Sequence, residues 1–209
     1  MHIDETAMKP LFGSHFRYGA TSGKALRVFA SIVLVGMLQA CQPPPVKVVK
    51  NFDVPYGLFQ TLIRQNVLPK GELLCKVHVA KNNLGDAWVP AVVLAAAEDD
   101  EEDYSLFLTS SPTKPVSDTR LFTLRTHVED KPVLDSTIYE ARDTNGDFSL
   151  RLAWHEDGSI TYQVATESSK SEEQLLQKPG FQTRHVSLHT SGVTGTTTCE
   201  LTGAKTDAR

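Results

Sequence analysis

The stretch FSLRLAWHEDGSITYQVA, residues 148–165, decides the fold class of this chain. Hydrophobic side chains alternate with polar ones from Phe148 to Trp154, and the alternation resumes after the pair Asp157-Gly158. A period of two residues is typical of a strand with one buried face, and an Asp-Gly pair between two such runs is typical of a tight turn. The stretch therefore predicts a β-hairpin.

The same period recurs along most of the chain. The predicted strands are residues 73–80, 88–97, 104–110, 120–128, 136–142, 148–154, 160–164, 184–189 and 196–202. A second turn pair, Asn145-Gly146, precedes the hairpin. About nine short strands at even intervals predict a mainly β fold, an antiparallel sandwich or barrel. Large inward residues such as Phe122, Leu152 and Trp154 favour a filled interior.

Two segments carry helical patterns instead. Between Asp53 and Asn66, four hydrophobic residues share one helical face: Leu58, Phe59, Leu62 and Ile63. Between Ser171 and Gln177, the serine is a potential N-cap, and Gln174 three residues later completes a capping box. We therefore expect one or two short helices beside the strands.

An uncharged apolar run, Val28 to Leu38, follows the basic residues Lys24 and Arg27. This order is that of a signal peptide, and the run is too short for a transmembrane helix, which needs about 20 apolar residues. The four residues Leu38-Gln39-Ala40-Cys41 resemble the lipobox of bacterial lipoproteins. An ordinary secretory leader and a short buried helix are the alternatives.

The resemblance implies that Cys41 is acylated, becomes the first residue of the mature chain and holds it at a membrane by lipid. Residue 42 is Gln and not the Asp that retains many such lipoproteins at the inner membrane, so the expected location is the outer membrane, facing the periplasm. The expected organisation is a signal peptide with a long n-region over 1–40, a lipidated cysteine and Pro-rich stem over 41–52, one β-rich domain over 53–203 and a disordered tail over 204–209.

The mature chain would be one acidic domain of 169 residues, Cys41 to Arg209. Four of the 21 Lys and Arg residues and two of the 25 Asp and Glu residues lie in the leader, which leaves 17 basic and 23 acidic residues and a net charge of −6. Nucleic acid binding depends on Lys and Arg neutralising phosphates, so a nucleic acid partner is not expected.

With Cys41 lipidated, Cys75 and Cys199 remain as an even pair in an oxidising compartment. Such a pair predicts a disulfide, and it would link the first predicted strand to the last. Two unpaired buried thiols are the alternative.

The run EDDEED between two predicted strands is a candidate partner-binding surface for a basic protein. Its residues are Glu98, Asp99, Asp100, Glu101, Glu102 and Asp103. A solvated connection or a calcium site would also fit six consecutive carboxylates. Two aromatic residues, Trp88 and Phe107, are further candidates for partner contact, because exposed aromatic side chains can mark a binding face. The alternative is that both pack into a core on the second face of their strands.

Metal and catalytic signatures are weak. Asp143, Asn145 and Asp147 have the oxygen spacing that opens a calcium loop, but the positions that should complete it hold Phe148 and Trp154. His185 and His189 would lie about 13 Å apart on one face of a strand, too far to share an ion. Neither G-x-S-x-G nor an activated cysteine occurs, so no catalytic residue, metal or cofactor is predicted.

These observations favour a non-catalytic protein-binding domain on a lipid tether. It would hold an envelope protein, as an inhibitor or immunity-type protein or as an assembly factor. The alternatives are a cell-wall hydrolase with dispersed carboxylates and a small-ligand carrier barrel.

Overall fold

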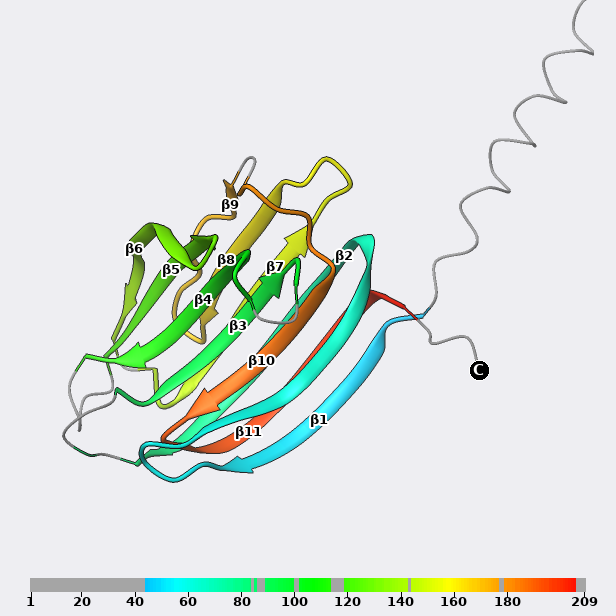
Figure 1. The fold of residues 1–209 in the computed structure, drawn as a ribbon. Helices are drawn as coiled ribbons and strands as arrows, with labels where there is room; N and C mark the ends of the chain where they lie inside the picture. The colour runs from blue at the N-terminus through cyan, green and yellow to red at the C-terminus, as the bar shows by residue number, and fades with distance from the viewer. Residues whose placement is uncertain are drawn as a thin grey trace, which may run out of the picture. The chain divides into compact units, whose positions relative to one another are not determined.

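The computed structural model describes residues 44–83, 85, 89–99, 102–113, 119–142, 144–176 and 179–205. These residues form eleven β-strands, and none of them lies in a helix (Figure 1). The strands are β1 (Val46–Asp53), β2 (Phe59–Asn82), β3 (Ala91–Ala97), β4 (Ser105–Pro112), β5 (Arg120–Val128), β6 (Lys131–Ala141), β7 (Asp147–Trp154), β8 (Ile160–Thr166), β9 (Gln174–Leu176), β10 (His185–Ser191) and β11 (Val193–Ala204).

The strands form two antiparallel sheets that share one long strand. Sheet A has the order β1-β11-β2-β7-β8-β9, and sheet B has the order β6-β5-β4-β3-β10-β2. The first part of β2, Phe59–Asn66, pairs with β10, and the later part, from Val67 onward, pairs with β11 and β7. In Figure 1, β2 rises in one layer and returns in the other. A sandwich is therefore the observed form of the two that the strand pattern predicts.

The crossing of β2 between the sheets depends on a tight contact with β7. Trp154 is 1% exposed, and its indole Nε1 donates to the Leu68 carbonyl oxygen at 2.8 Å. A Cβ on Gly71 would lie 2.5 Å from the Trp154 ring and 2.4 Å from the Thr202 carbonyl oxygen. Glycine is required here because strand and indole approach too closely for a side chain. Pro69 in the bend fits this picture, since it has no N–H to donate to a ladder.

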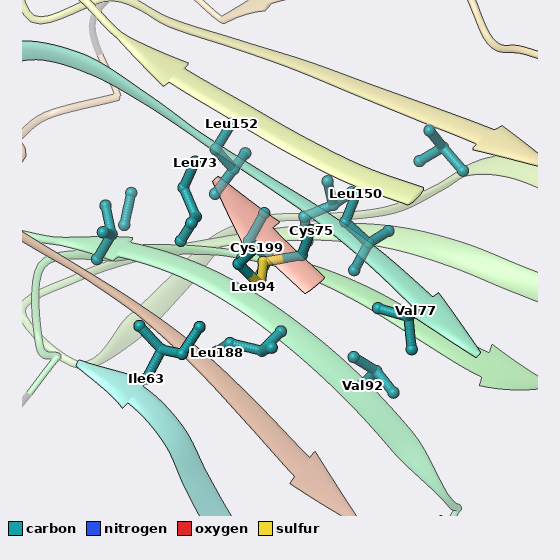
Figure 2. Packing of buried hydrophobic residues seen from close by; sticks show 14 of the residues in the cluster. Ile63, Leu73, Cys75, Val77, Val92, Leu94, Leu150, Leu152, Leu188 and Cys199 are labelled. Carbon is teal, nitrogen blue, oxygen red and sulfur yellow. A yellow bond between two sulfur atoms is a disulfide. The ribbon is translucent and has the colours of Figure 1, made fainter. Parts of the chain in front are cut away.

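The inward faces of the sheets form one apolar core. Figure 2 shows Ile63, Leu94 and Leu188 of sheet B together with Leu73, Leu150 and Leu152 of sheet A. Phe148 meets Phe122 of the opposite sheet in a T-shaped contact, with ring centroids 5.6 Å apart. Phe122 and Leu152 are fully buried, so the side chains expected to fill the interior do so.

The predicted disulfide between Cys75 and Cys199 is confirmed. The two residues lie directly opposite each other on β2 and β11, with Cα atoms 4.1 Å apart, and both are buried. The bond thus cross-links neighbouring strands of sheet A (Figure 2). It joins the second strand to the last, because β1 precedes β2.

Three local predictions are wrong. Residues of the expected stem form β1, which pairs with β11 from Val46 to Asp53. The helix expected between Asp53 and Asn66 is the first part of β2. The helix expected at Ser171 is replaced by β9, and the Ser171 hydroxyl accepts a hydrogen bond from the backbone of β8 instead of capping a helix. In each case pairing with another strand outweighs the local pattern, and for β1 and the first part of β2 that strand is distant in sequence.

The predicted turns are confirmed. Asn145 and Gly146 have φ of +47° and +79°, and Gly158 has φ of +81°. Asn145-Gly146 has the positive φ at both central residues that two-residue hairpin turns show. It is not a hairpin turn, however, because the strands on either side of it, β6 and β7, do not pair with each other. Within the described ranges, no helix has the length and apolar character needed to span a membrane.

Candidate functional site

The acidic run folds back against sheet B and is partly engaged within the chain. The carboxylate of Glu98 lies 3.4 Å from an Arg184 Nη2 and accepts the backbone N–H of Gln182. The carboxylate of Asp99 accepts the backbone N–H of Asp103 at 3.0 Å and thereby closes the turn. Asp100 and Glu101 lie outside the described residues, as do Trp88, Cys41 and the leader over 1–40. Partner binding by this run stays a prediction.

Glu102 is the member of the run that reaches furthest across the sheet. Its backbone has φ of +65°, a conformation that non-glycine residues rarely adopt, and its carboxylate lies 3.3 Å from His189 Nε2. The hydrogen bond with His189 lowers the pKa of Glu102 below its usual 4.5, against an opposing effect of burial and with help from the charges of His185 and Arg64. Strained backbone of this kind persists where surrounding contacts fix it.

His189 lies at the centre of this polar network on β10. Its ring is 3% exposed, Nε2 lies 2.6 Å from the Ser187 hydroxyl, and Nδ1 lies 3.0 Å from the Thr61 hydroxyl of β2. An ionised carboxylate can only accept, so the contact with Glu102 requires a proton on Nε2 of His189. His185 is also buried on the same face of β10.

A hydroxyl, an imidazole and a carboxylate in this order can activate a nucleophile. Here two contacts favour a structural role for His189. The buried Ser187 hydroxyl shares Nε2 with Glu102, and the Phe59 ring stacks on the imidazole at 4.9 Å between centroids. The network therefore joins the acidic run, β10 and β2, and its imidazole packs against the ring of Phe59.

Exposed apolar side chains gather near this network, at one end of sheet B. Phe59 is 63% exposed, Leu58 beside it is 57% exposed, and Val89 is 60% exposed. Phe59 lies opposite Ser191, which lies opposite Ala91, so Phe59 and the segment that leads into β3 flank the end of β10. Exposed apolar surface can mark an interaction site. Sequence reasoning missed it because Phe59 was assigned to the buried face of a helix.

The predicted contact residue Phe107 lies on the same outward face of sheet B, two strands away from β10. Its side chain is half-buried and meets the His127 ring edge-on, with centroids 5.4 Å apart. On β5, Arg125 lies opposite Phe107 and pairs with Asp135 at 2.7 Å. The structure leaves the predicted role of Phe107 untested.

The outward face of sheet A is hollowed at two places along β2 and β7. The first hollow, of about 530 Å³, is lined among others by Lys76, His78, Asp147, Ser149, Thr196 and Thr198. The second, of about 570 Å³, is lined among others by Lys70, Glu72, Arg151, His155 and Thr202.

Ion pairs organise this face. His78 Nδ1 lies 2.9 Å from the Asp147 carboxylate, so this carboxylate makes a contact within the sheet. Arg151 lies 2.7 Å from Glu72 and 2.5 Å from Glu173, and these hydrogen bonds raise the pKa of the guanidinium. Among the described residues, no group of three His, Cys, Asp or Glu side chains is placed to hold a metal ion.

One buried charge was not foreseen. Arg120 is 3% exposed, donates from Nε to the Ser110 hydroxyl at 2.8 Å and stacks over the Phe148 ring at 4.9 Å. Burial lowers the pKa of this guanidinium to about 10. Arg120 is therefore a buried structural cation that the face of the Phe148 ring stabilises.

No family model and no curated protein sequence matches this chain. Solved structures with a related arrangement of strands include the exoplasmic/lumenal domain of VIP36 in a Ca²⁺/Man2-bound form, with 10% identity, a TM-score of 0.46 and coverage of 78% of this chain and 83% of that one. They also include the legume lectin-like domain from Entamoeba histolytica, with 10% identity, a TM-score of 0.42 and coverage of 78% and 79%. The carbohydrate binding module CBM66 from Bacillus subtilis has 10% identity, a TM-score of 0.42 and coverage of 78% and 94%. No residue role is carried over from them.

Proposed function

We propose that the protein is a lipid-anchored envelope protein whose β-sandwich binds another protein without catalysing a reaction. The observation that carries this proposal is the apolar end of sheet B, defined as Leu58, Phe59 and Val89. Each of the three side chains is more than half exposed. Burying such side chains against a partner contributes about 25 cal/mol per Å² of apolar surface removed from water.

The backbone beside the apolar end supports the same proposal. From Phe59 to Gln65, β2 pairs with β10 on one side, and among the described strands none pairs with its other side. At Asn66 this edge is closed, because its carbonyl oxygen accepts the Lys205 N–H at 2.9 Å. A partner strand can add to an exposed edge through main-chain hydrogen bonds, while apolar side chains give specificity.

The support of Phe59 by His189 suits a binding anchor. The imidazole beneath the ring is itself held by Thr61, Ser187 and Glu102. An aromatic side chain that is fixed before binding loses little conformational entropy in the complex, which favours affinity. The acidic run would lie beside the docked partner, so a basic partner is proposed.

The envelope location rests on the lipobox-like residues Leu38 to Cys41. Metabolic labelling with a palmitate analogue tests it: the full-length protein should be labelled, and Cys41→Ser should not. An unlabelled wild-type protein would contradict the lipid anchor while leaving the binding proposal intact.

The binding proposal is tested by affinity capture from solubilised envelope with a tagged Gln42–Arg209 domain. Phe59→Asp should abolish capture of a stoichiometric partner. Val133→Asp is the matched control, because Val133 is 61% exposed on the distant strand β6. Retention of the partner by Phe59→Asp, or equal loss in Val133→Asp, would contradict the assignment of the surface. A single hydrolase or toxin would indicate an inhibitor, and several components of one machine would indicate an assembly role.

A further inference from the structure

We infer that the outward face of sheet A is a second binding site, and that its ligand is an uncharged oligosaccharide chain. This site lies on the opposite sheet from the apolar end and does not depend on the protein-binding proposal. Its basis is the shape, charge and hydrogen-bonding character of the two hollows, here called the sheet A trough.

The two hollows of the trough lie one after the other along β2. The first hollow includes Lys76 and His78 of β2, and the second includes Lys70 and Glu72 of the same strand. At about 3.3 Å per residue, Lys70 to His78 spans roughly 26 Å if fully extended. A linear ligand of several sugar units matches such a length, whereas one small molecule would fill a single hollow.

The charges that line the trough cancel. With histidine neutral, its cationic residues are Lys70, Lys76 and Arg151, and its anionic residues are Glu72, Asp147 and Glu167. Two of these carboxylates already have partners, since Glu72 pairs with Arg151 and Asp147 with His78. A polyanion or a polycation would therefore find no net attraction, which favours an uncharged ligand.

Hydroxyl groups supply the recognition chemistry. Thr196, Thr198 and Ser149 direct their side chains to the first hollow, and within the described part of the chain their hydroxyls have no protein partner. Each hydroxyl can donate one hydrogen bond and accept others, as can each hydroxyl of a sugar. The backbone of β2, β7 and β11 is committed to the sheet, so side chains alone can contact the ligand.

A peptide strand is a poorer occupant. Extended peptides bind mainly through the main chain at a sheet edge, and the trough lies on a face whose backbone groups are already paired. The hydroxyls and the paired charges of the trough instead match a ligand that offers hydroxyl groups along its whole length.

The test is isothermal titration calorimetry of the Gln42–Arg209 domain with chitohexaose and cellohexaose as uncharged probes and a hexamer of polygalacturonic acid as the charged probe. We expect at least one uncharged hexamer to bind and the charged one to bind at least tenfold more weakly. Thr196→Val/Thr198→Val removes two hydroxyls with little change of shape and should weaken binding about tenfold or more.

Thr123→Val is the matched control, because Thr123 lies on β5 of the other sheet. It should leave the affinity unchanged. Binding of neither uncharged hexamer, preference for the charged hexamer, or equal weakening in Thr123→Val would each overturn the inference. None of these results bears on capture of a protein through Phe59, so the two proposals fail separately.

Discussion

Removal of the Cys75–Cys199 disulfide should cost the domain a large part of its stability. The two cysteines are 124 residues apart. In the chain-entropy treatment, a closed loop of this length stabilises the folded state by about 5 kcal/mol at 25 °C, because it restricts the unfolded chain. Measured values for native disulfides are typically about 2–5 kcal/mol.

Two perturbations separate the cross-link from the packing of its sulfur atoms. Reduction of the wild-type Gln42–Arg209 domain breaks the bond and leaves both sulfur atoms in the core. Cys75→Ala/Cys199→Ala also removes the sulfur atoms from positions that are 0% and 1% exposed, which adds a void and about 1 kcal/mol or more of further loss. Cys41 is absent from this domain, so no other thiol contributes.

The assay is urea unfolding followed by tryptophan fluorescence, for which the buried Trp154 is a probe of the core. Reductant should lower the free energy of unfolding of the wild type by about 2–5 kcal/mol and raise the m-value, because the released chain exposes more surface. The double variant should be insensitive to reductant. A loss below about 1 kcal/mol with an unchanged m-value would refute the reasoning and indicate that β2 and β11 remain associated in the unfolded state.

Three further predictions concern single positions. Gly71→Ala should lower the free energy of unfolding by about 1–3 kcal/mol in the same assay, because the new Cβ would meet the Trp154 ring and the Thr202 carbonyl oxygen of β11. An unchanged unfolding midpoint would contradict that contact. Asp130→Gly should raise stability by about 0.5–1 kcal/mol, because residue 130 has φ of +57° in the β5–β6 turn, and a loss would show that the aspartate side chain matters there. The pKa of Glu102 is lowered on folding, so its contribution to the free energy of unfolding should be complete above pH 4.5 and vanish as the pH falls through the lower folded pKa. Glu102→Gln should therefore lose less stability in acid than the wild type, and identical stability profiles in acid would exclude the contact with His189.

The strands were predictable wherever alternation and turn residues agreed. All nine predicted strands are present, because the alternation that marks the buried face of a strand lies within a few consecutive residues. The first part of β2 was mistaken for a helix because a bulge lies opposite Leu188 and His189, where Leu62 is the extra residue. The bulge shifts the phase of alternation, and the resulting spacing of Phe59, Leu62 and Ile63 imitates a helical face.

The candidate sites were less predictable because their residues come from distant segments. Nothing in the acidic run indicates that Glu102 meets His189, which is 87 positions further along the chain and alternates with core residues on β10. The sheet A trough likewise joins β2, β7 and β11. Local patterns predict which face of a strand is buried, whereas such sites depend on strand order and register.

The position of β11 in sheet A affects how the chain folds during synthesis. This last strand lies between β1 and β2, the first two (Figure 1). While the chain is being made, β1 has no neighbour and one side of β2 stays open until β11 has been made. Pairings this remote in sequence form slowly. The pairing of β11 with β1 and β2 is therefore expected to form late, with Cys75 kept as a thiol until Cys199 appears, and a chain truncated before β11 should depend on chaperones to escape aggregation.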